Sequence, residues 1–153
     1  MRKHCKRKIW STKIDPVAHA IAGAAVADSR ALDKLRLCEL AAIDAMTRGK
    51  GTVEDWRWLA DVVNIAEMCG KNGIGPEVLP HCQEAQEALF QAARRYEKTK
   101  VMGLSGLGIK AVKNVWEFHD LQRTSIARSE YEKMIKKTAD YIRGHGKDVV
   151  EIT

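Results

Sequence analysis

The sequence has 153 residues, of which 45% are hydrophobic and 30% are charged, a composition that is ordinary for one globular domain. Its formal net charge is +6, and residues 1–13 hold six basic residues and no acidic one, which leaves 20 of each sign in the rest of the chain. This balance argues against a DNA-binding domain with a basic folded surface. No apolar run reaches the roughly 20 residues that a transmembrane helix needs.

Residues 1–14 are predicted to form a basic arm in front of the folded domain. Its candidate binding residues, for a partner protein or a nucleic acid, are Arg2, Lys3, Lys6, Arg7, Lys8 and Trp10. Lysine and arginine neutralise phosphates, and an indole ring can pack on a base. The arm can equally dock on a protein surface or remain in solvent without a specific role, and the sequence leaves these alternatives open.

The apolar residues 17–27 follow a positive start and end in Ala-Val-Ala, as a secretory signal does. The run contains no Leu or Phe, however, and it includes His19. Asp15 as an N-cap and Pro16 in the first turn instead predict a short, Ala-rich helix over residues 16–27. We therefore expect no cleaved signal and a cytoplasmic protein.

Two further helices are predicted from their start and stop signals. Ser29 can cap a helix that ends near Arg48, where Gly49 and Gly51 follow. Another helix is expected to begin at Pro76 and to end near residues 98–100.

The helix predicted between these two is apolar on nearly every side. Thr52 can cap it, and Gly70 can end it. Its narrow polar stripe consists of Glu54, Arg57, Asp61, Asn64 and Lys71. A helix of this kind is buried, so we expect it to be the central helix of a bundle or the main subunit contact of an oligomer.

The last predicted helix is unusually long. Ser105 can cap it, and no proline interrupts residues 107–143. A continuous helix of this length would be about 55 Å long and would overhang a domain of this size. Its middle, residues 119–125, is polar, so either the helix bends there or the segment faces a partner. Residues 147–153 are expected to form a C-terminal tail that frays.

Together these elements predict an all-α fold, a compact four- to five-helix bundle with a long C-terminal helix. The single helical domain would comprise residues 15–146, after the arm and before the tail. An overhanging helix suits dimerisation, so we expect a homodimer.

The sequence shows no catalytic motif, and we expect neither enzymatic activity nor a cofactor. The best catalytic candidate is the segment 117–120, Glu-Phe-His-Asp. Adjacent residues on a helix point about 100° apart, so neither carboxylate faces His119, and a half-buried histidine in a helix interface is the simpler interpretation. Cys69, His81 and Cys82 could supply three zinc ligands, but no fourth is evident, and small buried thiols are the preferred interpretation.

The order of several segments carries a resemblance. These segments are residues 15–25, 32–36, 42–44, 56–67, 73–75 and 118–123. They resemble a group of small proteins encoded by phages and mobile elements of Pseudomonas, Burkholderia and their relatives. Small helical proteins of such elements include anti-CRISPR proteins, to which this chain is similar in size and character.

The resemblance implies a non-enzymatic inhibitor in the cytoplasm of a bacterial host. Its partner would be a host CRISPR surveillance complex or its nuclease, and binding would block DNA binding or nuclease recruitment. The alternative is an accessory or regulatory protein that binds nucleic acid through the basic arm. Neither interpretation involves a membrane.

Overall fold

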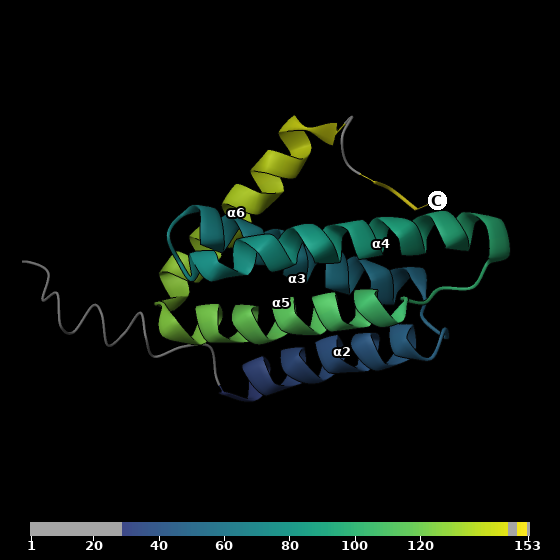
Figure 1. Ribbon diagram of the computed structural model, residues 1–153. Coiled ribbons are helices and arrows are strands. Elements are labelled where there is room, and N and C mark those ends of the chain that lie inside the picture. The colour runs from purple at the N-terminus through teal and green to yellow at the C-terminus, as the bar shows by residue number, and fades with distance from the viewer. Residues whose placement is uncertain (1–28, 147–149, 153) are drawn as a thin grey trace, which may run out of the picture.

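The computed structural model describes residues 29–146 and 150–152 (Figure 1). The basic arm and the helix predicted over residues 16–27 lie outside this part of the chain. The described elements are α2 (Ser29–Thr47), α3 (Val53–Lys71), the 3-10 turn η1 (Pro76–Val78), α4 (Leu79–Thr99), α5 (Gly106–Ser125) and α6 (Arg128–Gly144). The predicted all-α bundle is confirmed, and within these residues the one β-type contact is an isolated bridge between Gly51 and Met102.

Helix α3 is the centre of the bundle, as its apolar sequence predicted. It packs against α2, α4, α5 and α6, so nearly every side of it meets another helix. The helix begins in a capping box, in which the Thr52 hydroxyl accepts from the Asp55 N–H and the Asp55 carboxylate accepts from the Thr52 N–H. Gly73, with a φ of 83°, lies in the turn that follows the helix.

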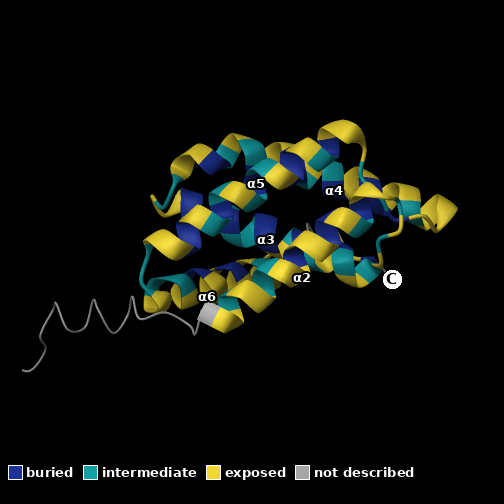
Figure 2. Ribbon diagram, turned by 90° about the horizontal axis from the view of Figure 1, so that it is seen from below, coloured by how far each residue is buried: buried dark blue, intermediate teal, exposed yellow. Residues whose placement is uncertain are grey.

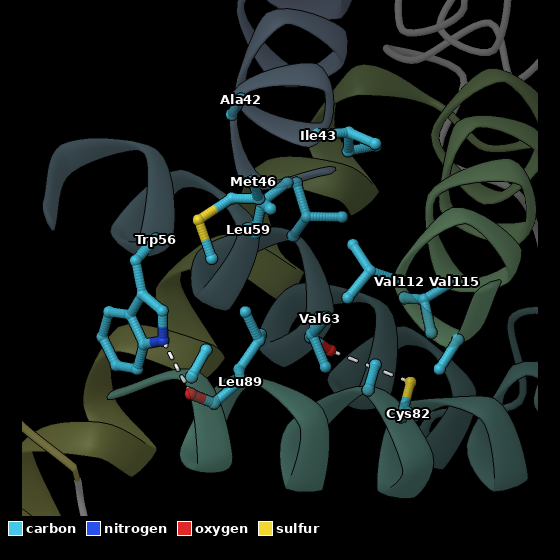
Figure 3. Close-up of a cluster of buried hydrophobic side chains, with 14 of the residues drawn as sticks. Ala42, Ile43, Met46, Trp56, Leu59, Val63, Cys82, Leu89, Val112 and Val115 are labelled. Carbon is cyan, nitrogen blue, oxygen red and sulfur yellow. Dashed lines mark hydrogen bonds between the residues drawn. The ribbon is translucent and has the colours of Figure 1, made fainter. Parts of the chain in front are cut away.

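The main hydrophobic core lies between α2, α3, α4 and α5 (Figure 3). Two hydrogen bonds satisfy polar atoms within it. The Trp56 Nε1–H donates to the Leu89 carbonyl at 2.9 Å, and the Cys82 thiol donates to the Val63 carbonyl at 3.8 Å. Figure 2 shows the buried residues on the inner sides of these helices and the exposed residues on their outer sides.

The close approach of α4 and α5 depends on small side chains. Ser105 caps α5 as predicted, because its hydroxyl accepts from the Gly108 N–H at 3.2 Å. Gly108 itself is buried, and a Cβ atom there would lie 2.9 Å from the Ala88 Cβ on α4. A larger residue at this position would therefore separate the two helices.

The segment 107–143 is not one helix, so the overhang of about 55 Å that a continuous helix would give does not form. Helix α5 ends at Ser125, and both Ile126 and Ala127 have extended backbone, with ψ values of 161° and 148°. The Ser125 and Thr124 hydroxyls donate to carbonyls of the preceding turn, an alternative to continued helix that such residues favour. The predicted bend is thus present, directly after the polar segment 119–125.

After this bend, α6 crosses α3 at an angle to the other helices (Figure 1). It buries only Met134 and Thr138, so most of α6 stays outside the main core. The chain then returns, and Ile152 is 5% exposed within the core cluster. The expectation that the whole C-terminal tail frays is therefore wrong for Ile152, which apolar burial holds in place.

Candidate docking groove

A groove with a volume of about 850 Å³ opens between α3, α4 and α6. It exists because α6 leaves the bundle at an angle after the bend and so does not pack along α4 (Figure 1). Helix α3 supplies the floor, and α4 and α6 supply the two walls. Val150, from the returning C-terminal segment, also lines the groove.

The polar stripe predicted on α3 forms much of the groove floor. Four of its five residues line the groove, namely Arg57, Asp61, Asn64 and Lys71. The fifth, Glu54, is exposed and lies 3.8 Å from the Arg57 guanidinium. The structure thus explains the stripe: it is the side of the central helix that no other helix covers.

Aromatic side chains face the groove from both walls. Phe90 on α4 is 37% exposed, and Tyr141 on α6 is 52% exposed. Ile142 and Met68 add aliphatic surface near them. A concave surface with accessible aromatic rings and a few polar groups is typical of a binding site.

At the Lys71 end of the groove, the polar groups are already paired. The Glu67 carboxylate accepts from Gln86 Nε2 at 2.6 Å and lies 3.1 Å from Lys71 Nζ. Lys71 Nζ is also 5.7 Å from the centroid of the Tyr141 ring, which stacks on His145 at 4.0 Å. This end of the groove is therefore preorganised by contacts between α3, α4 and α6.

Asp61 differs from these residues, because it has no hydrogen bond or ion pair with any part of the chain that the structure describes. Partial burial raises the pKa of its carboxyl group, and the nearby negative charge of Glu54 raises it further. The Asn64 amide, one turn further along α3, likewise forms no hydrogen bond to the described residues. Asp61 and Asn64 thus have polar atoms that no described residue binds and that a ligand in the groove can reach.

The catalytic candidate suggested by the sequence is placed elsewhere, in the interior between α5 and α6. His119 is 1% exposed, which is deeper than the half-buried position expected. Its ring nitrogens contact the Gln122 Oε1 at 3.2 Å and the Tyr131 hydroxyl at 2.9 Å. Burial, and to a smaller extent the Arg123 charge, lower the pKa of His119 to about 4. Neither Glu117 nor Asp120 hydrogen bonds to this ring, as the helical geometry predicted.

The zinc candidates do not assemble into a site. Cys69 and Cys82 are buried free thiols, and the His81 ring stacks on Phe118 with centroids 5.1 Å apart. Among residues 29–146 and 150–152, no group of three His, Cys, Asp or Glu side chains could hold a metal ion. The preferred interpretation, small buried thiols, is confirmed for Cys69 and Cys82.

The six candidate residues of the arm, Arg2, Lys3, Lys6, Arg7, Lys8 and Trp10, all lie outside the described residues. Their role stays a prediction. In the described part of the chain, no helix is both long and apolar enough to cross a bilayer.

Sequence reasoning missed the α4 and α6 walls of the groove. Phe90 and Tyr141 each fit an ordinary amphipathic helix, and no local signal shows that their helices diverge. Comparisons with protein-family models, with curated proteins and with solved structures find no match for this chain.

Proposed function

We propose that this protein is a non-enzymatic binding protein that docks another protein in the groove between α3, α4 and α6. The observation that carries the proposal is the uncovered polar stripe of the central helix, which lies between accessible aromatic rings on two walls. Aromatic residues around a few polar groups commonly provide most of the energy of protein–protein contacts.

The proposed partner is a CRISPR surveillance complex of a bacterial host, or the nuclease that this complex recruits. The sequence resemblance to anti-CRISPR proteins supports this target, and the groove supports the mode of binding. Inhibition would follow from occupying a surface that target DNA or the nuclease needs. The resemblance also supports a location in the host cytoplasm and a homodimer. The other argument for a dimer, an overhanging helix, no longer applies, because the helix breaks at Ile126 and Ala127.

The test uses purified type I surveillance complexes and their nuclease, with the full-length protein. A groove variant carries Phe90→Glu and Tyr141→Glu, which place charge on both walls. A matched control carries Leu107→Glu and Leu121→Glu, at positions that are 84% and 68% exposed and do not line the groove. All proteins are first compared by circular dichroism and thermal unfolding.

We expect the wild type and the control to bind one of these targets and to block DNA binding or cleavage. The groove variant should bind at least about tenfold more weakly, a loss of about 1.4 kcal/mol. If the wild type binds none of the surveillance complexes and not the nuclease, the proposed target is wrong. Equal binding by the groove variant would overturn the groove as the docking surface.

A second candidate function is nucleic-acid binding through the basic arm. The observation that favours it is the confinement of the whole charge excess to residues 1–13. Changing Arg2, Lys3, Lys6, Arg7 and Lys8 to Gln should then abolish an affinity for DNA or RNA that falls steeply with salt concentration. If the changed protein and the wild type bind nucleic acid equally, the arm is not the binding element.

A further inference from the structure

We infer that the groove accepts an amphipathic helix of a partner protein, with a Lys or Arg side chain that reaches Asp61. This inference rests on the proposed docking function and adds the chemistry of the partner segment. Three features carry it: the helical walls, the aromatic residues on the two walls, and Asp61, the one acidic group of the groove that has no partner among the described residues.

The walls favour a helical occupant over an extended one. Each wall is an α-helix whose backbone N–H and C=O groups, apart from those of its end turns, are bonded within the helix. An extended peptide gains its affinity from main-chain hydrogen bonds to a free strand edge, and the described part of this chain has only the single bridge between Gly51 and Met102. A helix satisfies its own backbone, so it needs only side-chain contacts from the groove.

The length of the groove suits a short helix. Its floor follows α3 from Arg57 to Lys71, about 21 Å at 1.5 Å per residue. A partner helix of about 14 residues spans the same distance and presents apolar residues at every third or fourth position along one side. These residues would contact Phe90 on one wall and Tyr141 on the other.

The charges in the groove define the polar side of that helix. Glu67 already holds Lys71 and Gln86, and Glu87 accepts from Gln91 Nε2 at 2.7 Å. Arg57 lies 3.8 Å from Glu54. Asp61 alone among the acidic groups of the groove lacks a partner in the described chain.

An apolar helix seated over Asp61 would remove water from its carboxylate, which is costly unless a cation or hydrogen-bond donor replaces that water. A Lys or Arg on the partner supplies the cation. An Asp or Glu at the same place would meet a like charge, and this repulsion gives the groove its selectivity.

The probes are three synthetic peptides of about 15 residues. The first is built from Leu and Lys, with Leu at every third or fourth position along one side of a helix. The second has Glu in place of Lys, and the third has the first sequence with a Pro at its centre, which breaks the helix. Fluorescence anisotropy measures the binding of each to the full-length protein.

The decisive variant is Asp61→Arg, and its matched control is Glu117→Arg. Glu117 is exposed on α5 and does not line the groove. Both substitutions replace an acidic residue with Arg, so they change the net charge of the protein equally. We expect the Leu-Lys peptide to bind the wild-type protein. Asp61→Arg should lower the affinity for this peptide by about tenfold, and Glu117→Arg should lower it by less than about twofold. The Leu-Glu and Pro-containing peptides should each bind at least about tenfold more weakly.

The inference is wrong if the Leu-Lys peptide binds Asp61→Arg as tightly as the wild type. It is also wrong if the Leu-Glu or the Pro-containing peptide binds the wild type as tightly as the Leu-Lys peptide does. If Phe90→Glu with Tyr141→Glu still abolishes binding to the CRISPR target in such a case, the proposed docking function stands and only the partner chemistry fails. A third outcome is that the wild type self-associates and that Phe90→Glu with Tyr141→Glu abolishes this association. The groove would then be a contact between two copies of this chain, and the inference would be wrong.

Discussion

Arg123 on α5 forms a bidentate ion pair with Glu39 on α2, with Nη1 and Nη2 donating to Oε1 and Oε2 at 2.9 and 2.8 Å. The side chains are 2% and 3% exposed. The Trp116 Nε1–H also donates to Glu39, at 2.8 Å. Asp120 accepts from Arg123 and from Arg36. This buried network fixes the position of α2 along α5, because planar bidentate pairs tolerate little displacement.

Arg123→Met should lower the free energy of unfolding by about 3–5 kcal/mol. The substitution leaves the Glu39 carboxylate buried, with the Trp116 indole as its remaining side-chain donor. An uncompensated buried charge is far less stable than a paired one. Urea unfolding followed by circular dichroism at pH 7 measures the loss.

The double variant Glu39→Leu with Arg123→Met serves as the control for this prediction. It removes both buried charges, so it should be more stable than Arg123→Met alone. Arg128→Met, which removes an exposed pair with Glu132, should cost less than about 1 kcal/mol. A double variant that is less stable than the single one would contradict the explanation.

The stability of the protein should fall as His119 becomes protonated. Its pKa is about 4 in the fold and about 6.5 in an unfolded chain. Between these values the unfolded state binds more protons, so the stability that neutral His119 contributes is complete above about pH 6.5 and is lost as the pH falls toward 4. The contribution is on the order of 3 kcal/mol for this shift.

Urea unfolding at a series of pH values between 7 and 5 tests this. The wild type should lose stability across this range, and His119→Gln should lose distinctly less. His145→Gln, at an exposed histidine, should retain the wild-type slope. Equal slopes for the wild type and His119→Gln would show that another group causes the pH dependence.

The beginnings of α3 and α5 were predictable because their signals are local. Thr52 and Ser105 each stand directly before the helix, three residues ahead of the residue whose N–H group they accept from. The break at Ile126 and Ala127 has no Gly or Pro to mark it, and the polar segment before it indicated only that a bend was possible. Its position follows from tertiary packing, since Met134 and Thr138 become buried only if α6 turns onto α3.

The ion pair of Glu39 and Arg123 was not predictable, because the two residues lie 84 positions apart and each looks like an ordinary surface charge on a helix.

The floor of the groove was predictable from the sequence, but its walls were not. Its polar floor on α3 was visible as a stripe, since a central helix has polar residues only where no neighbour covers it. The walls depend on the path of α6, which no local pattern specifies.

Gly108→Ala should lower the free energy of unfolding by about 1–3 kcal/mol, because the new methyl group forces apart a close contact. The added Cβ would lie 2.9 Å from the Ala88 Cβ and 3.2 Å from the Ser105 hydroxyl oxygen. Gly106→Ala, at the start of the same helix, meets no atom within 4 Å and should be neutral or stabilising by up to about 1 kcal/mol. Thermal and urea unfolding compare the two. Equal effects would show that α4 and α5 adapt freely at this contact.

The three described cysteines should differ sharply in reactivity. Cys38 is exposed on α2, whereas Cys69 and Cys82 are buried. Burial raises the pKa of Cys69 to about 11 and that of Cys82 to about 12, so almost no reactive thiolate forms at pH 8. Because Cys5 lies outside the described residues, the test uses a Cys5→Ser background. In this background, the Cys38 thiol should react with Ellman's reagent at least about 100-fold faster than the thiols of Cys69 and Cys82.

Unfolding in urea provides the control, since all three thiols should then react at one rate. Adding Cys38→Ser should remove the fast phase and leave the slow reaction unchanged. The slow rate should rise exponentially as the free energy of unfolding of each variant described above falls, because Cys69 and Cys82 become accessible only when the bundle opens. Fast reaction of all three thiols in the folded protein would mean that the core around Val63 and Cys82 is open to solvent, contrary to the packing found here.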